Sequence, residues 1–74
     1  MNSSCIYTQV MLQMYLNDLN CRELSARTGI AYPTLRRKLR GESDFLLAEA
    51  LRIKAVLNVP MTLEELFRKR GETA

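Results

Sequence analysis

The sequence predicts an all-α domain, a compact bundle of five short helices. Three observations indicate this fold class. Apolar residues recur at intervals of three and four along most of the chain, which is the spacing that lines one face of a helix. Capping residues, glycines and prolines divide this pattern into five segments. The 74 residues suffice for one small domain, and 47% of them are hydrophobic, which favours a folded core over disorder.

The first helix is predicted over residues 6–17. Its apolar residues form two stripes, so we expect it to be mostly buried, with its methionines in the core. Residues 17–20 end the helix, because their polar side chains bond to their own backbone. Residues 1–5 are expected to be a flexible terminus. The two stripes comprise Val10, Met11, Met14 and Tyr15, and then Leu12, Leu16 and Leu19.

The second helix is predicted over residues 21–28. Asn20 stands three residues before Glu23, which is the spacing of a capping box with Asn in place of Ser or Thr. Gly29 follows where the chain must turn through a left-handed conformation to leave the helix. We expect Leu24 on the buried face and Ile30, just after the turn, to enter the core.

The third helix is predicted over residues 32–40. Pro33 lies in its first turn, where a missing amide hydrogen costs little. Leu35 and Leu39 fall on one side and form the core stripe, with Arg36 at its border. The opposite side is therefore cationic and carries small residues: Pro33, Thr34, Arg37, Lys38 and Arg40.

Two further helices are predicted over residues 46–57 and 62–69. Leu46 is a poor cap, and Ser43 or Asp44 would serve if the fourth helix began earlier. Thr62 and Glu65 have capping-box spacing at the start of the fifth helix. Its last residues either interact with the negative end of the helix dipole or contact a nucleic acid, and residues 71–74 form a tail. These last residues are Arg68, Lys69 and Arg70.

Composition excludes several classes of function. The chain has no histidine and only two cysteines, which removes most metal sites and histidine-based acid–base chemistry, so we expect no enzyme, metal or cofactor. Cys5 and Cys21 are expected to be free thiols, with a disulfide as the minor alternative. The sequence has neither a signal-peptide pattern nor an apolar run of about 20 residues, so we expect a cytoplasmic protein without membrane contact.

Positive charge is concentrated in the middle of the chain. The net charge is +3, but residues 21–41 hold six of the 11 basic residues and only one of the eight acidic residues. A basic segment on an otherwise slightly acidic domain is typical of a phosphate-binding face. For any one of these arginines, a plain solvated surface charge remains the alternative.

The residues of this central segment also resemble a known family. Their spacing is similar to the helix-turn-helix of phage-repressor and Cro-like regulators, the XRE family, which implies a lambda-repressor-like fold. Ser25 would allow two helices to approach closely, and Gly29 would make the sharp turn. Ile30 and Leu35 would fill the angle between the helices and so set how far the third helix protrudes. The matching positions are Leu19, Asn20, Glu23, Leu24, Ser25, Gly29, Ile30, Thr34, Leu35, Leu39 and Gly41.

The resemblance implies sequence-specific binding of double-stranded DNA, with helix 32–40 in the major groove, by a small regulator such as a phage or mobile-element repressor. Tyr32, Pro33 and Arg37 occupy the positions that contact bases in the family. Arg37 would bond to guanine, and Tyr32, Pro33 and Thr34 would pack on thymine methyl groups. An aromatic side chain at the edge of the core is the alternative for Tyr32. The expected phosphate contacts are Cys21, Arg22, Arg36, Lys38 and Arg40.

Two questions about partners stay open at this stage. Regulators of this family commonly bind two half-sites as a dimer, so a homodimer is possible here, either in solution or only on DNA. Its surface would involve Met61, Leu63, Leu66 or Phe67 on the fifth helix. A protein-interaction module, such as an antitoxin-like or regulatory adaptor that uses the same scaffold, is the rival to DNA binding.

Overall fold

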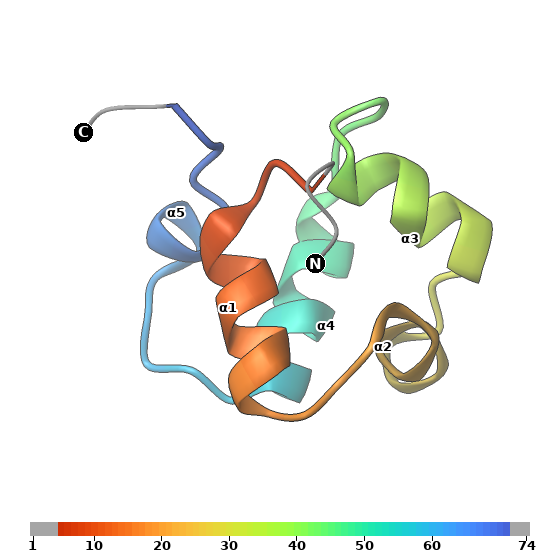
Figure 1. The fold of residues 1–74 in the computed structure, drawn as a ribbon, viewed down its shortest axis with the longest axis horizontal. Coiled ribbons are helices and arrows are strands. Elements are labelled where there is room, and N and C mark those ends of the chain that lie inside the picture. The colour runs from red at the N-terminus through yellow and green to blue at the C-terminus, as the bar shows by residue number, and fades with distance from the viewer. Residues whose placement is uncertain (1–4, 72–74) are drawn as a thin grey trace.

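The computed structural model describes residues 5–71, which form an all-α bundle (Figure 1). Within this range the structure has no strand, and one isolated bridge joins Tyr7 to Lys69. The predicted fold class is therefore confirmed. No helix in the described part of the chain is long and apolar enough to cross a membrane. The helices are α1 (Thr8–Leu16), α2 (Cys21–Thr28), α3 (Tyr32–Leu39), α4 (Leu47–Leu57) and α5 (Leu63–Leu66).

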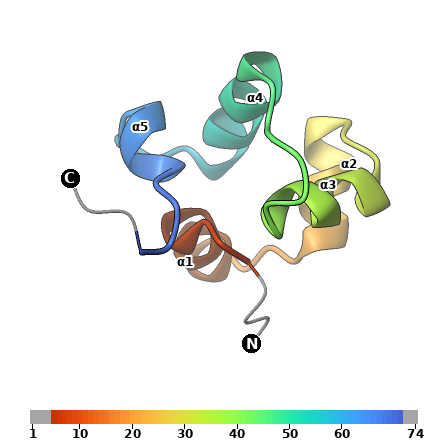
Figure 2. The same ribbon diagram turned by 90° about the horizontal axis from the view of Figure 1, so that it is seen from above.

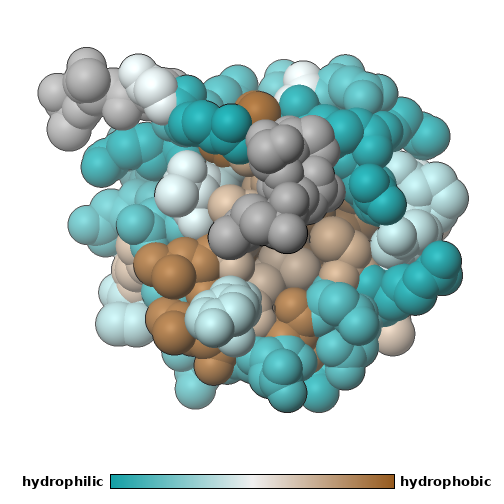
Figure 3. All heavy atoms as spheres, in the orientation of Figure 1, coloured by the Kyte–Doolittle hydropathy of each residue, from teal (hydrophilic) through white to brown (hydrophobic). Residues whose placement is uncertain are grey.

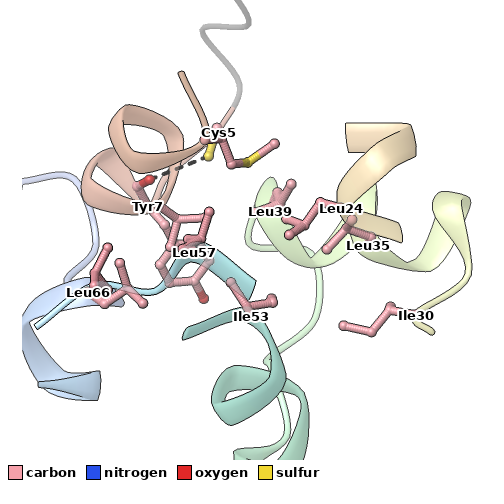
Figure 4. Close-up of a cluster of buried hydrophobic side chains, with 12 residues drawn as sticks. Cys5, Tyr7, Leu24, Ile30, Leu35, Leu39, Ile53, Leu57 and Leu66 are labelled. Carbon is pink, nitrogen blue, oxygen red and sulfur yellow. Dashed lines mark hydrogen bonds between the residues drawn. The ribbon is translucent and has the colours of Figure 1, made fainter. Parts of the chain in front are cut away.

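One core joins the helices. Figure 4 shows Leu24 of α2 next to Leu35 and Leu39 of α3, and a second group around Leu57 and Leu66. Helix α2 contacts both α3 and α4, and α5 contacts both α1 and α4. The core stripe predicted for the third helix is confirmed, because Leu35 and Leu39 are both buried. The side chains that are almost completely inaccessible are Val10, Leu24, Leu35, Ile53, Leu57 and Leu66.

Helix α1 begins two residues later than predicted, because residues 5–7 run along other parts of the chain. The Ile6 amide donates to the Leu39 carbonyl over 2.9 Å, and the Ile6 carbonyl accepts from the Arg70 amide over 2.6 Å. A backbone bonded in this way cannot join the helical ladder. Cys5 is buried, so it belongs to the folded domain and not to a flexible terminus. Residues 1–4 and 72–74 lie outside the described residues.

The prediction that the first helix is mostly buried is wrong. Only Val10 and Met14 of α1 are buried, whereas Leu12, Tyr15 and Leu16 are 44%, 79% and 64% exposed. Figure 2 shows α1 at one edge of the bundle, where the other helices cover one of its sides. Leu12, Tyr15 and Leu16 therefore face outward, whereas Leu19, the last residue of the predicted second stripe, lies beyond α1 and packs against the core.

Helix α5 is much shorter than the predicted 62–69. The predicted capping box forms, since Thr62 accepts from the Glu65 amide and Glu65 accepts from the Thr62 amide, but the helix ends at Leu66. The pKa of Glu65 is lowered first by the hydrogen bond from the Thr62 amide to its carboxylate and then by the hydrogen bond from the Thr62 hydroxyl, 3.2 Å from Glu65 Oε1. Phe67 then packs its ring against those of Tyr7 and Phe45, at centroid distances of 5.6 and 5.3 Å.

The expected interaction of the last basic residues with the dipole of the fifth helix is also wrong. Helix α5 ends before Arg68, and its last turn contains no basic residue. Lys69 forms a bridge with Tyr7, and Arg70 donates both its amide and its guanidinium to carbonyls of residues 5 and 6. The chain after α5 thus pairs with the chain before α1.

Helices α3 and α4 each lose one residue relative to the prediction. Helix α3 ends at Leu39, and α4 begins at Leu47 with Leu46 at the cap position. Since the fourth helix does not begin earlier, Ser43 and Asp44 do not cap it. Leu46 offers no side-chain acceptor, but its amide donates to Glu49 Oε1 over 2.9 Å.

Candidate functional site

The position of α3 depends on the turn that precedes it. Helix α2 begins with the predicted capping box, in which Asn20 Oδ1 accepts from the Glu23 amide over 2.8 Å and Glu23 accepts from the Asn20 amide over 3.0 Å. It ends at Gly29, whose φ of +77° is left-handed, as the sequence predicts. Figure 1 shows the consequence: α2 is seen end-on, while α3 runs across the view.

Side-chain hydroxyl groups hold this turn. Ser25 Oγ donates to the Ile30 carbonyl over 2.5 Å, and Thr28 Oγ1 donates to the Leu24 carbonyl over 2.7 Å. The Ile30 amide in turn donates to Thr28 Oγ1 over 3.4 Å. Ile30 is buried, as predicted, so the turn is tied both to α2 and to the core. A serine here supplies a hydrogen bond as well as a small volume.

A cluster of arginines gathers around Tyr32 at the start of α3. The Arg22 guanidinium carbon, from α2, lies 4.4 Å from the centre of the Tyr32 ring, and that of Arg36 lies 5.8 Å from it. Arg36 also donates to the Tyr32 hydroxyl over 3.1 Å, and this hydrogen bond raises the pKa of Arg36. Tyr32 is half-buried, and the side chains that lie over its ring are these two guanidinium groups.

A shallow hollow extends from this cluster along the outer side of α3. Arg37 is exposed in it, whereas Arg40 Nε contacts Glu42 Oε2 over 2.7 Å at the surface. Such an exposed pair is worth little and leaves Arg40 available to another anion. Pro33 is the exposed apolar member of the set. The hollow is lined by Tyr32, Pro33, Arg36, Arg37 and Arg40.

The structure thus brings most of the predicted site residues together, but it separates three of them: Thr34, Cys21 and Lys38. Thr34 is half-buried on α3 and does not line the hollow. Cys21 is the first residue of α2, and its side chain packs against the core. An anion contact from Cys21 would therefore use its backbone amide, one of the unpaired donors of a helix N-terminus.

The assignment of Lys38 to the anion-binding set needs correction. Its ammonium nitrogen lies 2.5 Å from Glu49 Oε1 of α4, and the two side chains are only 11% and 15% exposed. This hydrogen bond, followed by that from the Leu46 amide, lowers the pKa of Glu49. Glu49 neutralises Lys38 on the inner side of α3, so we remove Lys38 from the candidate site.

The cysteines are free thiols, as expected, and no disulfide joins them. Burial raises the pKa of the Cys5 thiol, which donates to the Tyr7 carbonyl over 3.6 Å (Figure 4). Within residues 5–71, no group of three or more histidine, cysteine or acidic side chains is placed to hold a metal ion.

Three contacts that shape this site were not predicted from the sequence: Arg36–Tyr32, Arg22–Tyr32 and Lys38–Glu49. The Arg36–Tyr32 bond had a signal, because residues four apart on a helix face each other. Arg22 belongs to another helix, and Glu49 lies beyond a turn, so neither had a local signal. Their partners depend on how α2, α3 and α4 pack.

The comparisons with known proteins find no match for this chain among protein-family models, curated proteins or solved structures.

The turn at Gly29 leads to a first prediction. We expect Gly29→Ala to lower the free energy of unfolding by about 1–2 kcal/mol, because a Cβ disfavours the left-handed conformation. Apart from the adjoining residues, no atom lies within 4 Å of the position that this Cβ would take, so backbone strain is the main cause. Gly29→Asn should cost less, since asparagine tolerates this conformation. Urea unfolding of the three proteins measures the difference, and equal stability of both variants with the parent would contradict it.

The Lys38–Glu49 pair leads to a second prediction. Because the folded state lowers the pKa of Glu49, the pair stabilises the protein above the unfolded-state pKa, and this contribution is lost as the pH falls through the folded-state pKa. Glu49→Gln should therefore reduce stability at neutral pH and flatten its decline between about pH 5 and pH 3. Urea unfolding at several pH values tests this. Glu64→Gln, at an exposed position on α5, is the control and should keep the parent slope.

Proposed function

We propose that this protein binds double-stranded DNA in a sequence-specific manner and acts as a small transcriptional regulator, of the repressor type found in phages and mobile elements. Helix α3 would enter the major groove. In this proposal the protein is cytoplasmic, is not an enzyme and needs no cofactor. Repression would follow from occupancy, since a protein bound at a promoter excludes polymerase.

The observation that carries this proposal is the convergence of Arg22, Arg36 and Arg37 around Tyr32 and the outer side of α3. Arg22 comes from α2, so the cationic surface spans two helices and is held in shape by the Tyr32 ring. Figure 3 agrees with a polar surface here, because hydrophilic side chains cover the region of α3. A rigid cationic surface on a protruding helix suits the phosphates on both sides of a DNA groove.

The two kinds of side chain in the hollow suggest two roles. Arg37 is exposed, and the arginines that lie over the Tyr32 ring are Arg22 and Arg36. Arg37 is therefore our candidate for a bidentate bond to guanine O6 and N7. Pro33 and Tyr32 offer apolar surface to a thymine methyl group, and Thr34 at their edge is a weaker candidate. Arg22, Arg36 and Arg40 would contact phosphates, together with the backbone amide of Cys21.

The resemblance to the XRE family supports the same proposal. The turn that the family pattern requires is present here as a capped α2, a left-handed Gly29 and a buried Ile30. These features orient α3, whereas charge alone would not. The resemblance and the arginine cluster are thus two separate lines of support for DNA binding through α3.

Base reading by Arg37 leads to a third prediction. After selection of bound sequences from random DNA, we expect Arg37→Ala to cost about 1–3 kcal/mol of binding free energy and to relax the preference at one base pair. Arg52→Ala is the control, because Arg52 is exposed on α4, away from the hollow. Titrations at one salt concentration measure both. An Arg37→Ala protein with unchanged affinity and base preference would rule out this role.

The different surroundings of Arg40 and Lys38 lead to a fourth prediction. Arg40→Ala should weaken binding to all sequences alike and reduce the slope of log K against log salt by about one, since one phosphate contact is lost. Lys38→Ala removes the same charge from α3 but should leave that slope unchanged and lower stability, because Lys38 is paired with Glu49. Affinity measured over a range of salt concentrations distinguishes the two. Equal slopes for both variants would contradict the assignment.

One observation favours the rival, a protein-interaction module. Three leucines of the α4 region are exposed, and surfaces of this kind often contact other proteins. Binding to specific DNA that survives excess competitor DNA would reject this rival as the main function. An absence of DNA binding even at low salt would favour it. The leucines are Leu46, Leu47 and Leu51.

A further inference from the structure

Helix α1 carries the outward apolar surface that the sequence analysis assigned to the core. We call it the α1 face, formed by Thr8, Met11, Leu12, Tyr15 and Leu16. Figure 3 shows hydrophobic side chains gathered over the position of α1. A groove lined by Thr8, Met11, Leu12 and Tyr15 runs along it. Leu16 and Tyr15 are among the most exposed large hydrophobic side chains in the described part of the chain.

The α1 face has no charge of its own. None of the nine residues of α1 is acidic or basic, so two such faces can meet without repulsion between like charges. Its apolar character also disfavours DNA as an occupant, because phosphates require cationic partners. The surface therefore fits another apolar surface.

The two ends of the α1 face carry opposite charges. At the end near Tyr15, the acidic residues Asp18 and Glu23 line a hollow together with that ring. At the end near Thr8, a second hollow is lined by three basic residues and one acidic residue, so this end is basic on balance: Arg68, Lys69 and Arg70 with Glu65. A second α1 placed antiparallel would bring each acidic end against a basic end. This charge pattern is self-complementary, as a two-fold symmetric contact requires.

We propose that the α1 face binds the α1 face of a second copy of this chain, antiparallel across a two-fold axis, and that this contact forms on DNA. The part of the proposal that involves DNA rests on the proposed function. The contact replaces the dimer surface expected on the fifth helix, because Leu66 is fully buried and Phe67 packs against Tyr7 and Phe45.

The size of the α1 face explains why DNA is needed. The exposed parts of Leu12, Tyr15 and Leu16 amount to roughly 400 Å² per copy. A stable interface buries about 800 Å² per partner, so this contact is of the weak, transient class. Two copies held on neighbouring half-sites meet at a high effective concentration, which makes a weak contact sufficient.

The placement of α1 is compatible with paired half-sites. Figure 2 shows α1 and α3 on neighbouring sides of the molecule and not on opposite sides. Two copies that touch through α1 can therefore both direct α3 toward one DNA duplex. The molecule measures 31 × 26 × 25 Å, so two touching copies are of a size that can occupy neighbouring half-sites, whose centres lie about 34–36 Å apart.

The first test compares DNA that carries one half-site with DNA that carries two, both derived from selected sequences. We expect the parent protein to bind the two-site DNA cooperatively. Leu16→Gln combined with Tyr15→Ser should lose this cooperativity, at least tenfold in affinity for the second site, and keep the affinity for a single half-site. Leu47→Gln is the matched control, because Leu47 is 69% exposed but lies on α4. Thermal unfolding verifies that each variant is folded.

The second test uses charge. Arg68→Glu should reduce cooperativity, because it faces Asp18 of the other copy, and adding Asp18→Asn should restore part of it by removing that repulsion. Asparagine is chosen because residue 18 has a φ of +56°. Arg52→Glu, with the same change of net charge on α4, should retain cooperativity. The affinity for a single half-site is also measured for Arg68→Glu and Arg52→Glu. An equal loss of this affinity in both variants is a general effect of net charge, so the cooperativity of each variant is compared with its own single-site affinity.

Measurements on the protein without DNA distinguish a failure of the α1 contact from a failure of the proposed DNA binding. Sedimentation equilibrium at high protein concentration should detect weak dimers of the parent that the α1 double variant does not form. Cooperative binding that survives the α1 variants, or is lost in Leu47→Gln instead, would overturn the α1 contact while DNA binding stands. If no DNA is bound, the proposed function fails, and sedimentation alone then decides whether the α1 faces pair. A monomer at every concentration would overturn the pairing in that case.

Discussion

The hydrogen bonds that tie Ser25 and Thr28 to Ile30 are the constraint on which the rest of this structure depends. They hold the chain through the left-handed turn at Gly29 and bury Ile30 at the same time. Because the turn is bonded to α2 and anchored in the core, the orientation of α3 relative to α2 is fixed. The outward side of α3, with its arginines, is set by this turn and not by the arginines themselves.

Contacts from outside the turn then hold α3 in place. On its inner side, Lys38 pairs with Glu49, which also accepts from the Leu46 amide at the start of α4. On its outer side, the Tyr32 ring lies against Arg22 of α2. The end of α3 is bonded to the segment before α1 through the Leu39 carbonyl. These contacts fix the cationic outer side of α3 relative to α2, α4 and the segment before α1.

Among residues 5–71, the exposed large hydrophobic side chains lie on α1 and in the region of α4. The α1 face has no charge, is bordered by opposite charges at its two ends, and lies beside α3 in space. A weak contact between two such faces would give cooperative binding once DNA brings the two copies together. DNA binding and pairing would then use separate surfaces of one bundle.

The sequence by itself determined the all-α class, helices α2 to α4 to within one residue, both polar capping boxes and the Gly29 turn. These features depend on residues within about four positions of one another, so local spacing reveals them. Only the tertiary structure decided that Lys38 faces inward, that Arg22 stacks on Tyr32 and that one stripe of α1 faces outward. It also decided that α5 ends after one turn, because the chain beyond it pairs with residues 5–7. In each case the contacting residues are far apart in the sequence. Local spacing does not predict which distant surface an apolar or charged side chain will contact.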